Sequence, residues 1–495
     1  MRWRDIWEYL MSEETSGTSL SLYNTLGKTK QTFTLPPHAR SVRMYNCGPT
    51  VYDTSHIGNL RSYVFADLLR RVLEYNGFSV RQVINITDFG HLSSDADSGQ
   101  DKMSTALKRA GLELTLENMR SLAEKYTEQF VVDLKRLNID TDNITFPRAS
   151  DHIAGEIALI RTLEEKGYTY KGKDGIYYDT SRFPEYGKLG NIYLEGLKEG
   201  ARVAAASDKR RPTDFLLWKS DEKLGWDSPW GKGFPGWHIE CSAMINATLG
   251  KQIDIHTGGV DLMPTHHNNE IAQSEAATGK KPFARFWLHH EFLNLDKEKI
   301  SKSVGNIINL SALVEKGYHP IAYRYFLLGA HYRSPLDFSW EALEAAQTAF
   351  LRLRHAADSL DVEPSTPPQK YKKRWHERLN DDLDTPGALA VLWEMLKDAQ
   401  HVSPSELKAG ILDADLVFGL GLGKDDAEAQ KLCAKMFGTL VRNEDLPERV
   451  KKLFEARVGA RTGKDWQRAD ALRKEIEALG YTIEDTGDIS RVSKK

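Results

Sequence analysis

Apolar and polar positions in the first part of the chain follow the pattern of a strand, then a helix, then a strand. Arg43–Cys47 is a short strand-like run that ends at Gly48-Pro49, and Asn59–Asn76 carries apolar residues at helical spacing. Val83–Thr87 is a second candidate for a buried strand. This order forms a βαβ unit, so the pattern predicts a parallel sheet.

Beyond this unit the pattern indicates further helices, a strand-rich segment and a long helical tail. We expect helices over Ser104–Asn138 and Asp151–Lys166, short strands between about Tyr168 and Phe234, and sheet-like sequence at Gln252–His256 and Trp287–Leu295. Everything after Trp340 is expected to be helical, interrupted by a Pro-rich linker at Glu363–Pro368, with a helix starting at Thr385-Pro386. The strand-rich segment therefore looks like a small domain inserted into the path of the sheet.

The composition is that of an ordinary soluble globular protein. The 495 residues carry a net charge of −3, with 28% charged and 40% hydrophobic residues, and this length suggests about three domains. No stretch approaches the roughly 20 apolar residues of a membrane span, and Asp5 and Glu8 do not suit a signal peptide. We therefore expect a cytoplasmic protein without membrane contact.

The three cysteines are better candidates for chemistry than for disulfide bonds. Cys47, Cys241 and Cys433 are an odd number and too few to staple a chain of this length, and Cys433 is interpreted as a packing residue. His266 and Glu270 are four residues apart and would share one face of a helix. With Cys47 and Cys241 they make a plausible zinc set, although on spacing alone buried packing cysteines are the commoner outcome.

Two short segments have the character of a phosphate site. His56 stands in a Gly-containing loop between a strand and a helix start, where free backbone N–H groups favour an anion. Lys299 and Lys302 lie in a loop with small hydroxyl residues, suited to neutralising a polyphosphate. Taken singly, a histidine at a helix start is more often a cap, and such a loop is more often a solvated turn.

In combination these segments resemble the paired signatures of class I aminoacyl-tRNA synthetases. His56-Ile57-Gly58-Asn59 follows the first strand, and Lys299-Ile300-Ser301-Lys302-Ser303 follows a late one. The resemblance implies that His56, Asn59, Lys299 and Lys302 hold ATP, presented with magnesium, while an amino acid carboxylate attacks the α-phosphorus. Two positions depart from the family: Asn59 replaces a histidine and cannot carry charge, and Ile300 replaces a methionine.

Longer segments are similar to the cysteinyl-tRNA synthetase family in order along nearly the whole chain. They are Met44–Asp53, Gly236–Met244, Asp254–Gly259 and Asp261–Met263. That family holds one zinc ion with two Cys, one His and one Glu, which match Cys47, Cys241, His266 and Glu270. A soft thiolate binds zinc far better than a hydroxyl, so such an ion would separate cysteine from serine where shape alone does poorly. Pro264-Thr265 and Asn268 depart from the family around the metal helix and leave the surroundings of the metal uncertain.

The same resemblance assigns Thr50, Thr87, Trp237, His256 and Asp261 to the cysteine pocket. Asp261 would pair with the substrate ammonium, and Trp237 would wall the site. Each has a plain alternative, because Trp237 could fill core and Asp261 could cap a helix.

The C-terminal region resembles the anticodon-binding part of the family. Asn380–Pro386 opens a helical bundle, and the resemblance assigns Arg461, Trp466, Asp470 and Asp485 to nucleic-acid contacts by stacking and hydrogen bonding on unpaired bases. In the last 45 residues, 11 Lys and Arg stand against 8 Asp and Glu. Trp466 also completes an apolar helical stripe and could therefore be core.

We accordingly expect an α/β protein with a Rossmann-like parallel-sheet catalytic domain that contains a small insertion, followed by a helical bundle and a small anticodon-binding module. The expected parts are an extension at 1–18, the catalytic domain at 19–145 and 236–340, the insertion at 146–235, the bundle at 341–445 and the module at 446–495. The expected activity is cysteine–tRNA ligation by a monomer with tRNA(Cys), cysteine and ATP as partners. Two rivals are a ligase joining cysteine to a small amine, disfavoured by the long tail, and a non-catalytic tRNA-binding paralogue, disfavoured by the retained lysines and zinc ligands. The polar loop 90–100 and the divergent end Gly487–Lys495 carry no interpretation.

Overall fold

The computed structural model describes residues 19–89, 102–190, 209–295, 298–299, 308–398, 400–441, 443–486 and 489–494. The chain divides into two compact units, one made of Ser21–Leu310 with Tyr332–Asp337 and the other of Met1–Leu20, Ser311–His331 and Phe338–Lys495. The expected extension at 1–18, the loop 90–100 and Lys302 lie outside the described residues. Within the described ranges, no helix is both long and apolar enough to cross a membrane.

A five-stranded parallel sheet forms the centre of the first unit. Its order is β11-β10-β3-β4-β5, and every neighbouring pair is parallel. The strands are β3 (Val42–Asn46), β4 (Val80–Ile84), β5 (Ile144–Thr145), β10 (Ile253–Gly259) and β11 (Ala284–His290). In the register of the sheet, Met44 lies between Gln82 and Ile255. The parallel sheet predicted from the βαβ pattern is confirmed.

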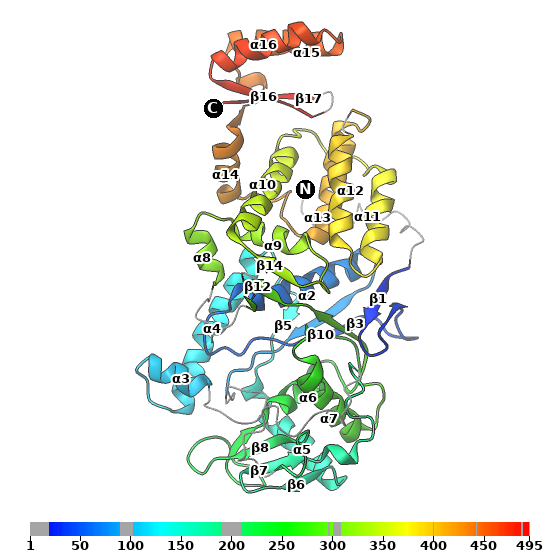
Figure 1. Ribbon diagram of the computed structural model, residues 1–495, viewed down its shortest axis with the longest axis vertical. Coiled ribbons are helices and arrows are strands. Elements are labelled where there is room, and N and C mark those ends of the chain that lie inside the picture. The colour runs from blue at the N-terminus through cyan, green and yellow to red at the C-terminus, as the bar shows by residue number, and fades with distance from the viewer. Residues whose placement is uncertain are drawn as a thin grey trace. The chain divides into compact units, whose positions relative to one another are not determined.

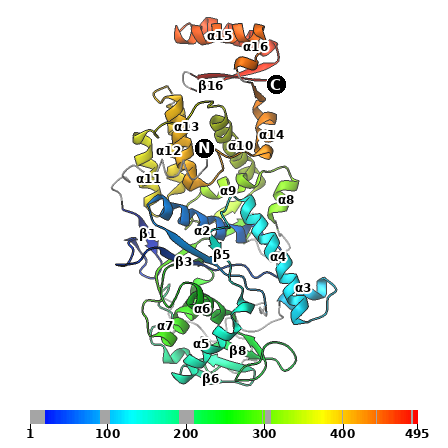
Figure 2. The ribbon, with the colours of Figure 1, turned by 180° about the vertical axis from the view of Figure 1, so that it is seen from behind.

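Helices cover both faces of this sheet, as in a doubly wound fold. Helix α2 (Ile57–Tyr75) lies on one side, and α6 (Trp237–Thr248) and α7 (Asn268–Thr278) lie on the other (Figures 1 and 2). α2 begins two residues before the expected Asn59 and ends one residue before Asn76. The side chain of His56 caps it, which explains the early start.

Two expected elements are each split in the structure. The stretch Ser104–Asn138 forms α3 (Lys102–Arg109) and α4 (Leu116–Arg136), because Gly111 adopts a φ of 69° and Thr115 caps the second helix. The stretch Trp287–Leu295 belongs to two strands. β11 ends at His290, and β12 (Leu293–Leu295) joins a separate small sheet with β13 (Glu298–Lys299) and β14 (Leu336–Phe338).

The strand-rich segment forms the short strands expected there, in a four-stranded antiparallel sheet of order β6-β7-β8-β9. Its strands are β6 (Thr169–Lys171), β7 (Gly175–Tyr178), β8 (Phe215–Ser220) and β9 (Gly233–Pro235), and α5 (Ile153–Glu165) precedes them. Buried side chains from this sheet, such as Trp218, share one hydrophobic core with α6 and with β10 and β11 of the parallel sheet. β1 (Ser21–Asn24) and β2 (Thr29–Thr32) form a separate antiparallel hairpin in this unit.

The second unit is mostly helical but ends in a sheet. Its helices are α9 (Pro320–Leu328), α10 (Trp340–Asp358), α11 (Gln369–Asn380), α12 (Thr385–Lys397), α13 (Pro404–Phe418), α14 (Ala427–Phe437), α15 (Glu448–Thr462) and α16 (Trp466–Ala478), and α8 (Leu310–Glu315) spans the boundary between the units. α12 starts at Thr385 with Asp384 as its cap, as predicted.

The expectation of an entirely helical tail is wrong. β15 (Thr439–Val441), β16 (Tyr481–Thr486) and β17 (Ile489–Lys494) form an antiparallel sheet of order β15-β17-β16. Tyr481 and Ile483 alternate with a less buried threonine and pack with Val492 against Phe454 and Ile476. This period of two is the signature of a strand with one buried face.

Candidate metal centre and active site

The strand order reverses between β3 and β10, which is where the carboxyl ends of an open parallel sheet leave a crevice. The strand order runs from β3 to β4 and β5 in one direction and to β10 and β11 in the other. Ligands of open parallel sheets bind at such a reversal point. A Cβ at Gly48 would lie 1.6 Å from the Asn85 carbonyl oxygen, so only glycine lets the loop after β3 pass this close to the segment after β4.

Hydrogen bonds fasten that loop along the edge of the sheet. The amide of Val51 donates to the Thr87 carbonyl at 3.1 Å, and the amide of Thr87 donates to the Pro49 carbonyl at 3.0 Å. The amide of Gly48 donates to Asn85 Oδ1 at 2.7 Å. Cys47, the first residue of the loop, therefore stands at a fixed position beside the crevice.

Four predicted metal ligands meet in the crevice. Cys47 follows β3, Cys241 lies in α6, and Glu270 lies in the first turn of α7. His266 lies in the π-helical turn η4 (Met263–His267) that leads into α7, so the expected helical spacing to Glu270 is present. One ligand atom from each of the four lies within 4.8 Å of the others, and His266 Nε2 is 3.0 Å from Glu270 Oε1.

The donor set of this cluster fits zinc. Bond lengths of about 2.0–2.3 Å place tetrahedral donors roughly 3.3–3.8 Å apart, so small side-chain adjustments suffice to close the site. Two sulfur atoms, one imidazole nitrogen and one carboxylate oxygen are donors that zinc accepts. Cys241, His266 and Glu270 are at most 2% exposed and Cys47 is half-buried, so Cys47 is the most accessible of the four ligands.

Charges in the cluster are mutually compensating. A hydrogen bond with Cys47 lowers the pKa of Cys241 to about 6 against the opposing effect of burial. Burial disfavours a charged imidazole, but hydrogen bonds with Cys241 and Glu270 raise the pKa of His266 to about 10. Burial also disfavours the carboxylate of Glu270, yet the charges and hydrogen bonds of His256 and His266 lower its pKa to about 2. The Cys241 thiolate and the Glu270 carboxylate thus flank a protonated His266, whose proton a bound cation would displace.

Two further histidines orient the ligands. His256 Nε2 lies 2.9 Å from Glu270 Oε2, and His238 Nδ1 lies 2.9 Å from His266 Nδ1. Such contacts fix the direction of a ligand side chain. His238 was not among the residues predicted from the sequence, although its place three residues before Cys241 on the same helix was a usable signal.

The first phosphate-site segment lies within the described residues, whereas only the Lys299 backbone of the lysine segment does. His56 and Asn59 form a reciprocal cap of α2: the Asn59 amide donates to His56 Nδ1 at 3.2 Å, and the His56 amide donates to Asn59 Oδ1 at 3.4 Å. The amide of Ile57 donates to the Ile308 carbonyl at 2.8 Å, which ties the helix start to the chain that leaves the lysine loop. The Lys299 backbone lies in β13, while its side chain lies outside the described residues.

Of the expected cysteine-pocket residues, Trp237 and His256 contact side chains of the metal cluster. Thr50 and Thr87 form a bridge between the two loops, and the Thr87 hydroxyl donates to Glu240 Oε2 at 3.0 Å. Trp237 is half-buried with its ring centroid 4.3 Å from that of His266, so it borders the cluster and is not a simple core residue. Asp261 is exposed beyond β10, and the turn that follows it has no side-chain cap, which excludes the capping alternative for that turn.

A group of buried carboxylates behind the pocket was missed from the sequence. Asp88, Glu156 and Glu240 are at most 3% exposed. Burial, together with the charge of Glu156, raises the pKa of Glu240, and burial with the charge of Asp88 raises that of Glu156. Asp88 accepts hydrogen bonds from Ser150. Isolated acidic residues in helices carry no sequence signal for burial, because most of them are solvated.

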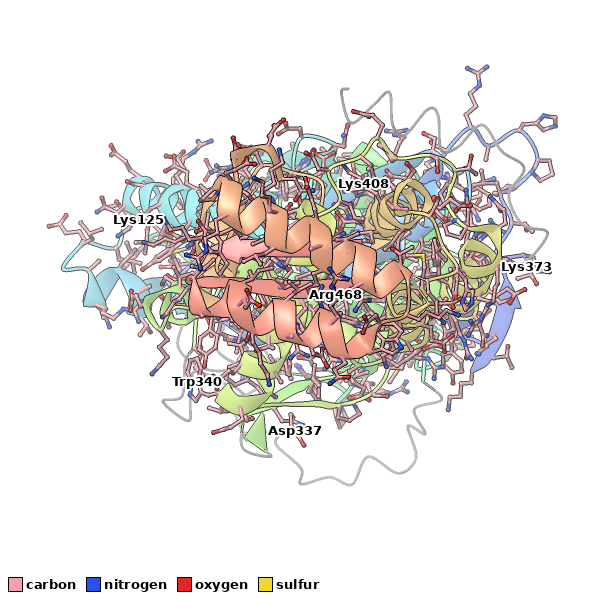
Figure 3. The ribbon with its side chains drawn as sticks, turned by 90° about the horizontal axis from the view of Figure 1, so that it is seen from above. Lys125, Asp337, Trp340, Lys373, Lys408 and Arg468 are labelled. Atoms are coloured by element: carbon pink, nitrogen blue, oxygen red, sulfur yellow. The ribbon has the colours of Figure 1, made fainter. Side chains whose placement is uncertain are left out.

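The C-terminal residues divide into a surface group and an internal one. Trp466 is 57% exposed at the start of α16, with the Arg461 guanidinium 5.6 Å from its ring centroid, so its interpretation as core is wrong. Arg468 lies exposed on the same helix, seen from above in Figure 3, and Asp470 is also exposed. By contrast, Asp485 pairs with Arg457 at 2.6 Å and with Arg461 at 3.0 Å.

Comparison with known protein families accounts for most of the chain. Residues 33–348 match the family model described as the class I tRNA synthetase (C) catalytic domain, and residues 443–491 match the cysteinyl-tRNA ligase anticodon binding domain. Cysteine–tRNA ligase 1 of Burkholderia lata is 47% identical over 96% of both chains. Cysteine–tRNA ligases of Treponema denticola and Thermus thermophilus are 41% and 40% identical over 94% of this chain and 98% of theirs.

Solved structures agree at the level of the fold. A methionyl-tRNA synthetase of Mycobacterium tuberculosis in complex with methionyl-adenylate superposes with a TM-score of 0.55, covering 82% of this chain and 95% of its own. Its sequence identity is 16%. The resemblance inferred from the sequence motifs and the predicted fold class are both confirmed.

Proposed function

The chain belongs to the cysteinyl-tRNA synthetase family, and we propose from that premise how its residues divide the work of the reaction. The reaction is cysteine–tRNA ligation: cysteine and ATP give cysteinyl adenylate and pyrophosphate, and a terminal ribose hydroxyl of tRNA(Cys) then accepts the cysteinyl group. The observation that carries the proposal is the cluster of Cys47, Cys241, His266 and Glu270 at the start of the loop that leads to His56.

Selection of cysteine over serine is assigned to this cluster. The four side chains would hold a zinc ion, which would supply a Lewis acid that prefers a thiolate to a hydroxyl. Trp237, packed on His266, walls the pocket and limits its width. His256 holds the carboxylate of Glu270 from behind, and the exposed carboxylate of Asp261 pairs with the substrate ammonium. Thr50 and Thr87 line the side formed by the joined loops.

We assign neutralisation of the negative charge on the ATP phosphates to the N-terminus of α2 and to the lysine loop. The N-terminus of α2 favours an anion through its dipole and its amides, and His56 stands at that end. Asn59 holds His56 in place through the cap and adds no charge. Lys299 and Lys302 neutralise the charge that develops as the α-phosphorus is attacked, in the manner of preorganised electrostatic catalysis.

Cysteine-dependent ATP–pyrophosphate exchange, with serine as the control substrate, tests the proposal. Cys241→Ser is expected to abolish exchange with cysteine, because it removes a ligand from the metal that binds the thiol. Normal cysteine affinity in this variant would favour a purely structural zinc. Full activity of chelator-washed, metal-free protein would refute the selection mechanism altogether.

Transfer to tRNA is assigned to the second unit. The exposed Trp466 stacks on an unpaired base and Arg461 supports it by hydrogen bonding and charge. The match to an anticodon binding domain supports tRNA over a small amine as the acceptor. A charging assay with tRNA(Cys) separates these acceptors. The proposed enzyme is a monomer, which light scattering of the purified protein tests.

A further inference from the structure

The crevice holds a second group of metal-ligating side chains beside the zinc donors assigned above. Cys47, His256, His267 and Glu270 each present a ligand atom within 4.8 Å of the other three. Cys47 and Glu270 also belong to the zinc set, whereas His256 and His267 do not. Both of these histidines are fully buried at 0% exposure. Six side chains therefore make two overlapping sets of four donors.

The shared carboxylate has the orientation of a bridge. Oε1 of Glu270 lies 3.0 Å from His266 Nε2, in the first set, and Oε2 lies 2.9 Å from His256 Nε2, in the second. Each oxygen thus faces the imidazole of a different set. A carboxylate that offers one oxygen to each side can bind two cations at once.

The shared thiol also stands between the two sets. Cys47 Sγ lies within 4.8 Å of the ligand atom of Cys241, in the first set, and 3.3 Å from His267 Nε2, in the second. A cysteine thiolate has more than one lone pair and is able to bridge two soft ions. The Cys47 sulfur therefore lies between the two donor sets, as the Glu270 carboxylate does.

The ring of His267 is oriented by a hydrogen-bond partner on its second nitrogen. Its Nδ1 lies 2.8 Å from His289 Nε2, and His289 Nδ1 lies 2.9 Å from Thr25 Oγ1. With the proton on Nδ1 donated to His289, the lone pair of His267 Nε2 faces Cys47. Metal-binding histidines typically have their second ring nitrogen fixed by such a partner.

We propose that Cys47, His256, His267 and Glu270 bind a second divalent cation of the zinc and cadmium class, with the Cys47 thiolate and the Glu270 carboxylate shared between the two ions. The nitrogen and sulfur donors favour such ions over magnesium or calcium. His256 belongs to the proposed cysteine pocket, so the second ion also competes with cysteine. This competition rests on the proposed function, whereas the metal site does not.

Metal stoichiometry of the full-length protein tests the site without any measurement of activity. Equilibrium dialysis against zinc, followed by metal analysis, is expected to give two equivalents per chain, and the cadmium-113 form is expected to give two resonances. His267→Gln should remove one equivalent and one resonance and keep the other. Cys241→Ser is the matched variant, because it removes a donor of the first set alone and should weaken binding of the first metal equivalent.

A variant outside both donor sets guards against loss of folding. His289→Phe removes the partner of His267 without removing a donor and is expected to weaken the second equivalent by about 10–100-fold. Circular dichroism checks the fold of each variant. A wild-type protein that binds only one equivalent, or two equivalents that neither His267→Gln nor His289→Phe changes, would overturn the site.

Competition with cysteine is measured separately. The KM for cysteine in ATP–pyrophosphate exchange is expected to rise when the second equivalent is loaded and to rise less in His289→Phe at the same zinc concentration. An unchanged KM at two-ion loading overturns the competition. Absence of cysteine-dependent exchange would refute the proposed function, while the dialysis result would still decide the metal site.

Discussion

Replacing Asp485 by asparagine is expected to destabilise the folded C-terminal segment, because it removes an internal ion pair. Asp485 accepts hydrogen bonds from Arg457 at 2.8 and 2.6 Å, from Arg461 at 3.0 Å, and from the Ser490 hydroxyl. Arg457 is only 1% exposed. The substitution therefore leaves a buried guanidinium without its counter-charge, which proteins tolerate poorly.

The size of the effect follows from burial. Removing one partner of a fully buried ion pair costs about 3–5 kcal/mol, and the partial exposure of the Asp485 side chain, 16%, reduces the expected loss to about 2–3 kcal/mol. Burial opposes the charged form of Asp485, but the two arginines and Ser490 lower its pKa overall. A lowered folded pKa stabilises above the unfolded value of about 3.9, and this stabilisation is lost as the pH falls through the folded pKa. The difference between wild type and variant should therefore be largest near neutral pH and shrink in acid.

Hydrogen exchange measured by mass spectrometry on the full-length protein tests this expectation. Peptides from residues 446–486 should exchange about 30–150-fold faster in Asp485→Asn at neutral pH, the equivalent of 2–3 kcal/mol. Glu477→Gln is the matched control, because its pairing with Arg473 is a surface contact with side chains about 40% exposed and is expected to change exchange little. Unchanged protection together with lost tRNA charging would refute the reasoning and place Asp485 at the nucleic acid.

Three further substitutions test other parts of the site. Trp466→Ala should leave the unfolding midpoint and pyrophosphate exchange unchanged but lower kcat/KM for tRNA about 5–150-fold, the loss of 1–3 kcal/mol of base stacking; Met436→Ala, 45% exposed, is the control, and an unaffected kcat/KM would contradict stacking. Thr87→Val deprives buried Glu240 of its donor and should destabilise by about 1–3 kcal/mol in urea unfolding; equal stability would show that Glu240 finds another partner. Asn59→His should speed exchange by adding a chargeable group beside the phosphates, and a slower rate would argue against charge at that position.

The fold was largely accessible from periodicity because its sheet strands are buried and its helices amphipathic. The strand predicted at Arg43–Cys47, the helix predicted at Asn59–Asn76 and the start of α12 at Thr385 were found within two residues. The second strand, predicted at Val83–Thr87, lies three residues earlier, at Val80–Ile84. The C-terminal sheet was missed because its strands, such as β16 with the sequence Tyr481–Thr486, are rich in polar residues. Gly111 divides a helical stretch whose composition otherwise favours one helix, since local backbone freedom overrides the pattern.

The metal cluster was accessible only in part. His266 and Glu270 carry a local signal, because four residues of a helix set them on one face. Cys47 and Cys241 carry none, because their meeting depends on the end of β3 lying beside α6, which no spacing encodes. Resemblance to a family supplied that link. The supporting side chains His238, His267 and Glu240 were missed, because histidines and glutamates in helices are ordinarily solvated and only burial reveals their partners.

The hydrogen-bonded pairing of the loops after β3 and β4 has a consequence for engineering new amino acid specificity. Main-chain hydrogen bonds from Val51 to Thr87 and from Thr87 to Pro49 join the two loops. Gly48 also passes Asn85 so closely that there is no room for a methyl group. Side-chain libraries at Thr50 or Thr87 can alter the polarity of that wall but leave its spacing untouched. Accepting a bulkier thiol amino acid would require redesign of the backbone pairing between the two loops, so enlargement is better sought at the side chain of Trp237, which packs on His266.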